Sequence, residues 1–200
     1  MDLRITPFQT ADIQALPSLQ PERWGDIRFA YTRYLSDVYC SPVKIEVAQQ
    51  VVGVGTTIDL GRTGWLGHII VSPQYQRRGI GSRIVSGLVE LLERTGTTTI
   101  SLIATNEGYP VYRRFGFRDE CEYVFYENVA EACEQDDVAT SDYVRPMNHK
   151  NLDEVLRIDR HVTGEDREAV IKGNYSDGVI YSSSNVITGY YLPNLGSGLV

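Results

Sequence analysis

Residues 69–85 read IIVSPQYQRRGIGSRIV: an apolar run, a polar turn and the start of a helical pattern. Gly79 and Gly81 can adopt positive φ and let another molecule approach the backbone closely. The first amides of the following helix have no partner within it, and the helix dipole adds partial positive charge there. The stretch is therefore typical of a phosphate or pyrophosphate cradle, with Arg77 and Arg78 available for charge-assisted contacts.

Two other phosphate-binding motifs do not fit this stretch. A P-loop requires Gly-Lys followed by Ser or Thr, which does not occur here. A dinucleotide-binding fingerprint requires a third glycine at position 84, which is Ile84. The remaining alternative is a glycine-capped turn that binds no ligand.

The composition restricts the classes of partner. The chain has 200 residues and a formal net charge of −7, with no long run of Lys or Arg. Proteins that bind nucleic acids or membrane surfaces usually carry a basic patch, so neither partner is expected. No apolar stretch approaches the roughly 20 residues that a membrane-spanning helix needs.

The cysteines and histidines predict no metal site. Cys40, Cys121 and Cys133 form no pair at metal-binding spacing, and His149 and His161 have no companion ligands. The odd number of cysteines and the lack of a signal peptide predict a reducing, cytoplasmic setting.

Hydrophobic patterning predicts alternating strands and helices before residue 129. Strands are expected at residues 3–8, 43–49, 51–60, 64–72 and 97–105, with one or two more between 117 and 129. Helices are expected at residues 11–20, with a break at Pro17, at 24–39, directly after Gly79 and Gly81, and at 110–117. In the helix at 24–39 one apolar face is formed by Ile27, Tyr31, Leu35 and Val38.

The rest of the chain repeats part of this order. Residues 129–141 are acidic and rich in small side chains, which predicts a solvated linker. Residues 142–200 then give a strand, helices and two more strands, without a second glycine turn. Roughly sixty residues by themselves would form only a marginal hydrophobic core. This segment is therefore expected to pack on the first domain or on a partner chain, as in a homodimer, or to be the front part of a longer protein.

Two motifs together resemble those of the GNAT superfamily of N-acetyltransferases. Its acetyl-coenzyme A (acetyl-CoA) signature is Arg/Gln-x-x-Gly-x-Gly/Ala, which is matched by Gln76, Gly79 and Gly81. A later family motif places an Asn after a strand, followed by a helix that ends in Tyr-x-x-x-Gly-Phe. The stretch NEGYPVYRRFGF resembles it, with matches at Asn106, Tyr112, Gly116 and Phe117.

The resemblance covers residues 1–128 and implies an α+β (mixed α/β) fold. A twisted, mostly antiparallel sheet would be flanked by helices in an acetyl-CoA-binding N-acetyltransferase domain at 1–128. The linker at 129–141 would lead to a partial second GNAT-like domain at 142–200, as in tandem acetyltransferases.

The resemblance also implies how acetyl-CoA binds. The strands that end at Val71 and near Thr105 would splay apart and take up the pantetheine arm, and the Val71 amide would contact the thioester carbonyl as that oxygen becomes negatively charged. The pyrophosphate would lie on the amides from Arg78 to Ser82. The implied cofactor-binding residues are Ile69, Ile70, Val71, Gln76, Arg77, Arg78, Gly79, Ile80, Gly81, Ser82, Asn106 and Tyr112.

The catalytic groups implied are the Val71 amide and Tyr112, whose phenol would protonate the departing thiolate. The alternative for Tyr112 is a side chain that only packs against the cofactor pocket. The base is open, because the strand position that carries Glu in some family members is matched here by Trp65. Strand alternation places His68 on the face of Leu66 and Ile70, opposite Val71, unless a bulge breaks it. Other candidates for the base are Glu46, Asp59 and a water chain.

The first functional hypothesis is an enzyme that transfers acetyl from acetyl-CoA to a primary amine of a small molecule, peptide or protein, in a ternary complex. The second is a non-catalytic acetyl-CoA-binding sensor or regulatory module, which the missing strand carboxylate favours. Aromatic residues in and beside the helix at 24–39 would border the family's substrate groove or pack in the core: Trp24, Phe29, Tyr31, Tyr34 and Tyr39.

Overall fold

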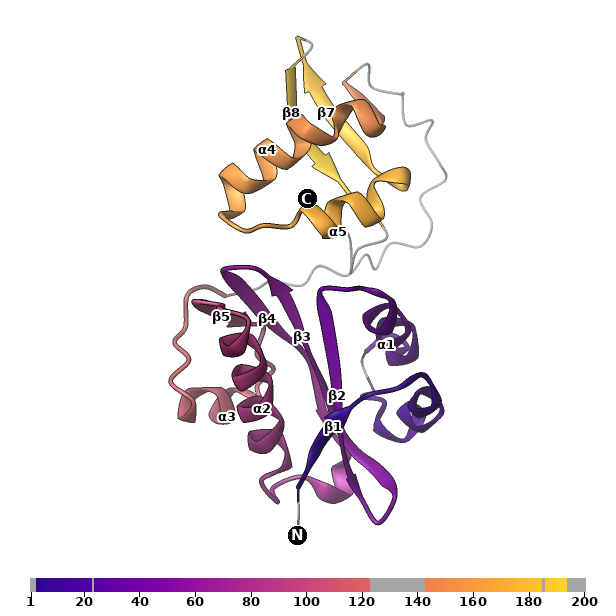
Figure 1. The fold of residues 1–200 in the computed structure, drawn as a ribbon, viewed down its shortest axis with the longest axis vertical. Helices are drawn as coiled ribbons and strands as arrows, with labels where there is room; N and C mark the ends of the chain where they lie inside the picture. Colours follow the sequence, from indigo (N-terminus) through magenta and orange to yellow (C-terminus); the bar gives the residue numbers. More distant parts are fainter. Residues whose placement is uncertain (1–2, 23, 123–142, 185, 194–200) are drawn as a thin grey trace. The chain divides into compact units, whose positions relative to one another are not determined.

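The computed structural model describes residues 3–22, 24–122, 143–184 and 186–193 (Figure 1). The chain divides into two compact units, Met1–Tyr123 and Val124–Val200. The predicted linker at 129–141 and the proposed domain boundaries on either side of it lie outside the described residues, as does Cys133.

The first unit is built on a five-stranded sheet in the order β1-β2-β3-β4-β5. The strands are β1 (Ile5–Pro7), β2 (Cys40–Val47), β3 (Gln50–Leu60), β4 (Thr63–Val71) and β5 (Thr99–Leu102). β1 to β4 pair antiparallel, and β5 pairs parallel to β4. The mostly antiparallel sheet expected from the sequence is therefore confirmed.

Helices cover both faces of this sheet, with α2 (Ile80–Arg94) on one side and α1 (Ile27–Ser36) on the other (Figure 1). Apolar residues recur every four positions along α2, so that Ile84, Leu88 and Leu92 form one buried face. A Cβ atom at Gly53 in β3 would lie only 2.9 Å from the side chain of Ile84. The helix thus packs directly on the backbone of β3 and fixes where its N-terminus lies.

Three local predictions differ from the structure. A 3-10 helix, η1 (Thr10–Leu19), runs through Pro17 instead of breaking there, since its hydrogen-bond pattern is shorter than that of an α-helix. α1 ends at Ser36, and Val38 beyond it is 94% exposed instead of joining the apolar face. Residues 117–122 form no strand, and the remainder of the predicted strand region at 117–129 lies outside the described residues.

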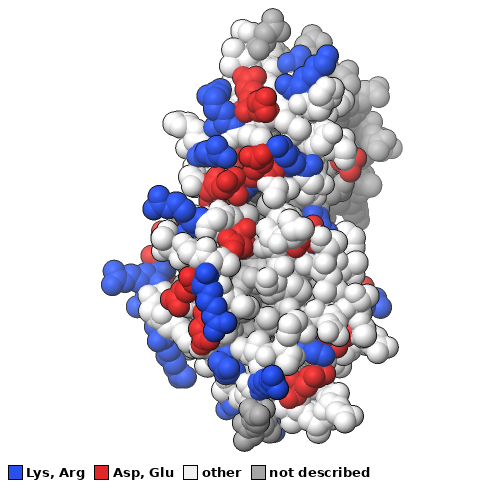
Figure 2. Space-filling model, in the orientation of Figure 1, with Lys and Arg blue, Asp and Glu red and all other residues white. Residues whose placement is uncertain are grey.

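The later part of the first unit contains two short helices, η2 (Pro73–Tyr75) and α3 (Tyr109–Arg114). η2 lies in the loop from β4 to α2, where the sequence predicted a turn and no helix, and α3 follows β5 near the predicted helix at 110–117. Among the described residues, no helix combines the length and apolar composition needed to cross a membrane. On the face drawn in Figure 2, acidic and basic side chains are interspersed.

The second unit has a three-stranded antiparallel sheet in the order β6-β7-β8. Its elements are β6 (Val144–Pro146), η3 (His149–Asn151), α4 (Leu152–Thr163), α5 (Glu168–Asn174), η4 (Tyr175–Asp177), β7 (Val179–Ser183) and β8 (Val186–Tyr191). Val155 of α4 and Ile171 of α5 pack against Ile180 and Ile187 of the sheet. The order of a strand, helices and two strands is the order in which the first unit begins.

Candidate active site

A cavity of about 910 Å³ opens in the first unit where β4 and β5 separate. Its walls come from β4, the loop that follows it, the first turn of α2, the segment after β5 and α3. One further wall is the segment before α1, which includes Trp24. Residues far apart in the sequence therefore meet around one space.

The cavity has an unpaired strand edge on one side. β4 pairs with β5 only from Thr63 to Leu66, although β4 continues to Val71. Ser72 donates its backbone N–H to Val52 of β3, at 2.9 Å. Because successive amides of a strand point in opposite directions, the Val71 amide faces the edge that β5 leaves open.

Nine of the twelve residues predicted to bind the cofactor line this cavity: Ile69, Ile70, Val71, Gln76, Arg77, Gly79, Gly81, Ser82 and Tyr112. In the described part of the chain, Arg78, Ile80 and Asn106 are not among the lining residues. The Arg78 guanidinium lies 5.2 Å from the ring centre of Tyr75, and the side chain of Ile80, the first residue of α2, is buried in the core. Cofactor contacts through any of the twelve remain a prediction.

The loop before α2 has the backbone of an anion cradle. Arg77 and Gly79 both have positive φ, of 59° and 83°, and Gly79 is the residue directly before α2. Such turns direct successive N–H groups into one concavity, where the helix N-terminus adds positive potential. The Gln76 side chain donates to the Val71 carbonyl at 3.2 Å, which ties this loop to the end of β4.

Tyr112 of α3 lies half-buried in the wall of the cavity. Its ring meets the ring of Phe117 edge to face, with 6.1 Å between centres. A Cβ atom at Gly108 would lie 2.9 Å from the Tyr112 ring, so the missing side chain makes room for it. Burial raises the pKa of Tyr112, so that its hydroxyl keeps its proton at neutral pH.

A β-bulge changes the position predicted for His68. Val54 and Thr56 of β3 pair with Ile70 and Gly67, which leaves one additional residue in β4, and His68 has a φ of 45°. Leu66 packs in the core beneath α2, whereas Ile70 packs in the core beneath α1. The predicted common face of Leu66 and Ile70 is therefore wrong, because the bulge reverses the alternation between them.

The His68 ring lies in an aromatic pocket at the cavity wall. Its Nδ1 is 2.7 Å from the Tyr34 hydroxyl, and the Trp24 ring stands edge to face at 5.4 Å. The Tyr31 hydroxyl donates to the His68 carbonyl at 3.0 Å and holds the bulge. Burial lowers the pKa of His68, which favours a neutral imidazole at neutral pH.

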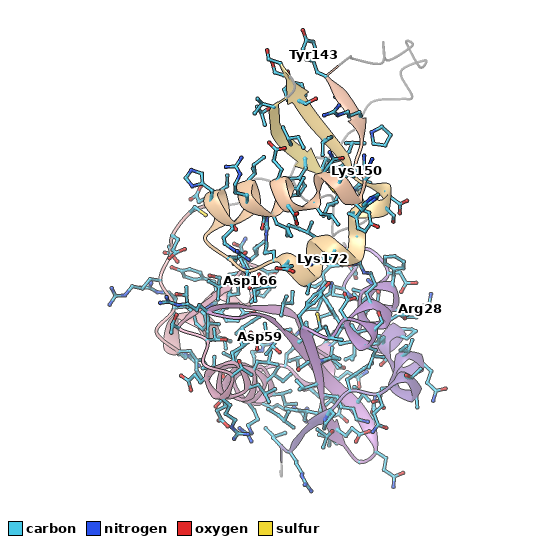
Figure 3. The ribbon with its side chains drawn as sticks, turned by 45° about the horizontal axis from the view of Figure 1, so that its top comes forward. Arg28, Asp59, Tyr143, Lys150, Asp166 and Lys172 are labelled. Atoms are coloured by element: carbon cyan, nitrogen blue, oxygen red, sulfur yellow. The ribbon has the colours of Figure 1, made fainter. Side chains whose placement is uncertain are left out.

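The other candidates for a base lie elsewhere. Glu46 accepts from Lys44 at 3.1 Å on β2. Asp59 accepts from the Gly61 amide at 2.9 Å in the turn between β3 and β4 (Figure 3). Within the described residues neither carboxylate lines the cavity, and no group of three or more His, Cys, Asp and Glu side chains forms a metal site.

The sequence identified the aromatic residues as a group but not their arrangement around His68. Trp24 and Tyr34 precede His68 by more than 30 positions, and the alternation of a regular strand directs His68 away from Gly67. The residue type of His68 was the only local signal, since no sequence pattern marks a bulge at that position.

Comparison with known proteins agrees with this architecture. Residues 28–133 match the family model described as an acetyltransferase (GNAT) domain. YyaT of Bacillus subtilis, uncharacterised, is 29% identical over 79 residues, which are 40% of this chain and 53% of that protein. YitH of the same organism, called an uncharacterised N-acetyltransferase, is 40% identical over 57 residues, or 28% of this chain and 20% of that protein. The chain thus spans about half of one curated relative and a fifth of the other.

Solved structures share the fold. A Pyrococcus horikoshii structure described as an acetyltransferase superposes with a TM-score of 0.66 at 21% identity, over 96% of this chain and 72% of that chain. A predicted acetyltransferase of Clostridium acetobutylicum, solved with acetyl-CoA, gives a TM-score of 0.51 at 22% identity, over 62% of this chain and 96% of that one. The family match covers more than half of the chain, and the sheet, the glycine loop and the open edge of β4 agree with it. The chain belongs to the GNAT family of acetyltransferases.

Proposed function

We propose that the first unit transfers an acetyl group from acetyl-CoA to a primary amine by direct attack in a ternary complex. The observation that supports this most strongly is that one cavity joins the open edge of β4, the anion cradle before α2 and the Tyr112 hydroxyl. A thioester carbonyl at the open edge, a pyrophosphate at the cradle and a leaving sulfur at Tyr112 fit these three features.

Each of these groups has one chemical task. The Val71 amide donates to the carbonyl oxygen of the thioester as negative charge develops on it. The amine nitrogen forms a bond to the carbonyl carbon, and the bond from that carbon to sulfur breaks. Tyr112 gives its proton to the departing thiolate and is reprotonated from the nitrogen of the adduct. Binding both reactants in one cavity supplies a large part of the rate enhancement.

An amine acceptor agrees with the cavity and with the fold relatives. Glu22 and Glu107 line the cavity, and their carboxylates would attract a cationic amine. One neighbour, AAC(6')-Iy (TM-score 0.53, 14% identity, 65% of this chain and 100% of that chain), was solved in complex with a bisubstrate analogue of CoA and acetylneamine. Another neighbour (TM-score 0.52, 14% identity, 64% and 99%) is the glucosamine-6-phosphate N-acetyltransferase of Arabidopsis thaliana. The acceptor proposed here is the same chemical class.

The alternative is a sensor or regulatory module that binds acetyl-CoA without turnover. It is favoured by Trp65, which stands where some family members carry a strand carboxylate. Binding and catalysis separate the two functions, because only the enzyme releases free CoA when an amine is added.

We expect acetyl-CoA to stabilise the purified chain and an amine panel to elicit thiol release. At a concentration of 100 times Kd the stabilisation is about 2.7 kcal/mol, visible as a rise in Tm. Stabilisation without turnover on small-molecule, peptide or protein amines identifies the sensor. A Tm that acetyl-CoA does not change would contradict both functions.

Gly81→Val is expected to weaken acetyl-CoA binding about tenfold or more, because the new side chain occupies the surface proposed for the pyrophosphate. A Cβ atom at this position meets only Val71, at an ordinary 3.8 Å, so Gly81→Ala fits the fold, and a Tm near wild type without acetyl-CoA checks that Gly81→Val does so too. Calorimetry measures the Kd, and Gly81→Ala gives a smaller effect in the same direction. Ser86→Val is the control, because Ser86 lies on the same helix outside the residues that line the cavity; equal losses in Ser86→Val and Gly81→Val would rule out this binding site.

We infer from its order of elements that the second unit is a partial GNAT-like repeat. The order β6, helices, β7 and β8 supports this, as does the antiparallel pairing of its sheet. Its packing in a homodimer, the cytoplasmic location and the lack of a nucleic-acid or membrane partner remain predictions from the sequence.

A further inference from the structure

The proposed reaction needs a group that accepts a proton from the acceptor. A primary alkyl amine arrives mainly as the ammonium at neutral pH and has no lone pair for attack until it loses a proton. Tyr112 holds its own proton and serves the leaving sulfur. The strand position that carries a carboxylate in some family members is Trp65, and neither Glu46 nor Asp59 lines the cavity. Glu22 and Glu107 do line it, but both are exposed, whereas His68 is half-buried in its wall.

His68 is placed in the cavity by an unfavourable backbone conformation. A left-handed φ is unfavourable for a non-glycine residue, and such conformations cluster at functional sites. At His68 the surrounding side chains stabilise this conformation, because Tyr31 binds the carbonyl and Tyr34 contacts the ring. His68 lines the cavity, and it lies in the part of β4 that extends beyond its pairing with β5.

The contact with Tyr34 determines which nitrogen is free. When Nδ1–H donates to the Tyr34 oxygen at 2.7 Å, Nε2 carries the lone pair on the other side of the ring. We propose that His68 Nε2 is the general base that takes a proton from the incoming ammonium, with Tyr34 as its positioning residue. This inference rests on the proposed acetyl transfer and adds to it the group that starts the reaction.

These groups account for every proton that moves in the reaction. Nε2 forms a bond to one ammonium proton, which leaves a neutral amine and an imidazolium. After attack, the second proton of the adduct nitrogen replaces the one that Tyr112 gave to sulfur. The products are the amide, free CoA with a thiol, and an imidazolium that returns its proton to water.

The side chains around His68 favour a neutral imidazole in the resting protein. Trp24, Tyr31 and Tyr34 contact it, and none of them carries a charge at neutral pH. The carboxylates of Glu22 and Glu107 line the same cavity. Burial lowers the pKa of His68 from 6.5, so the base form is present above that lowered pKa and is lost as pH falls through it. The acid side of the kcat/KM profile is therefore expected below pH 6.5.

Nitrogen NMR on histidine-labelled protein tests the tautomer without any acceptor. At pH 7 we expect the His68 signals of a neutral ring protonated on Nδ1, both alone and with acetyl-CoA bound. A ring protonated on Nε2 in the acetyl-CoA complex would overturn the proposal, since that nitrogen could not accept the proton.

Kinetics on an amine substrate test the role in catalysis. His68→Gln is expected to lower kcat/KM about 100-fold and to remove the acid limb of the profile, while the Kd for acetyl-CoA stays near wild type. His68→Gly, which suits the positive φ, is expected to regain activity when imidazole is added. Tyr34→Phe should lower kcat and move the acid limb, whereas Tyr39→Phe, whose hydroxyl binds Asp37 at 3.0 Å outside the cavity, should change neither.

Two failures are distinguishable. A wild-type chain that binds acetyl-CoA but turns over no amine refutes the proposed transfer and the role of His68 with it. A wild-type chain that is active, together with a His68→Gln variant that keeps its rate and its acid limb, refutes the role of His68 alone.

Discussion

Replacing Tyr112 with phenylalanine is expected to lower kcat by about 10²–10⁴-fold at saturating acetyl-CoA. The substitution removes only the hydroxyl, so the ring still packs on Phe117 and in the space left by Gly108. Without a proton donor the thiolate must leave as an anion or wait for water. The Kd for acetyl-CoA should change little, because the same apolar surface remains in the cavity.

The matched control for this variant is Tyr109→Phe. Tyr109 belongs to the same helix, is 42% exposed, and donates its hydroxyl to Asp119 at 3.0 Å. It does not line the cavity in the described part of the chain, so its loss should leave kcat within about twofold, as expected for a surface change of less than about 0.5 kcal/mol. Full turnover by Tyr112→Phe would show that this tyrosine only packs against the pocket.

The pH dependence gives Tyr112 a second test. Because burial raises the pKa of this phenol above 10, the acid form is present throughout the neutral range and is lost only as pH rises through that raised value. The wild-type kcat should therefore hold its plateau on the alkaline side to beyond pH 10. If the wild-type profile fell on the alkaline side below pH 9, and this fall disappeared in Tyr112→Phe, the pKa of Tyr112 would be lower than its burial predicts.

Most of this fold follows from local patterns in the sequence. The four-residue repeat of Ile80, Ile84, Leu88 and Leu92 predicts α2 because the helical period and the apolar face coincide. The antiparallel hairpins follow from alternating strands separated by short turns, which leave few other ways to pair. The prediction for the end of α1 is wrong at Val38, because an apolar residue at the right spacing is also compatible with an exposed turn.

In the candidate site, too, the features that depend on local sequence could be predicted and those that depend on long-range packing could not. The turn at Gly79 and Gly81 could be predicted from the sequence, because a positive φ before a helix favours glycine and the residue type indicates it locally. His68 was not readable, since the bulge that turns it arises from the pairing of β4 with β3 and from contacts with Tyr31 and Tyr34. Long-range packing decides such a position, and no pattern within the strand carries that information.

Long-range contacts also involve Asp159 in the second unit, and we expect Asp159→Ala to lower the stability of that unit strongly. Asp159 of α4 is 3% exposed and accepts hydrogen bonds from Arg167 and from the Tyr190 hydroxyl. Arg167 also donates to Tyr190 at 3.1 Å, which closes a network of three side chains from α4, the segment before α5 and β8. Removing the carboxylate leaves a largely buried guanidinium without its main acceptor, which costs about 3–5 kcal/mol.

A unit of this size has little stability to spare, since whole domains are stable by only about 5–15 kcal/mol and small ones lie at the lower end. We therefore expect Asp159→Ala to lose hydrogen-exchange protection across β6, β7, β8 and α4. Protection of α2 in the first unit is the internal reference for the measurement. The triple variant Asp159→Leu/Arg167→Met/Tyr190→Phe should recover much of the loss, because it leaves no member of the network unpaired and apolar side chains of similar volume often replace a buried ion pair without cost.

Arg160→Ala is the control that tests whether the loss of stability is specific to the buried network, because Arg160 belongs to an exposed ion pair. Arg160 lies 3.3 Å from Asp166 in the same unit, and both side chains are more than half exposed. Exposed pairs contribute about 0–1 kcal/mol, so this variant should keep nearly all of its exchange protection. If Asp159→Ala were as stable as Arg160→Ala, the network of Asp159, Arg167 and Tyr190 would not hold the second unit together. The charge on Arg167 would then have to be solvated within an otherwise intact fold.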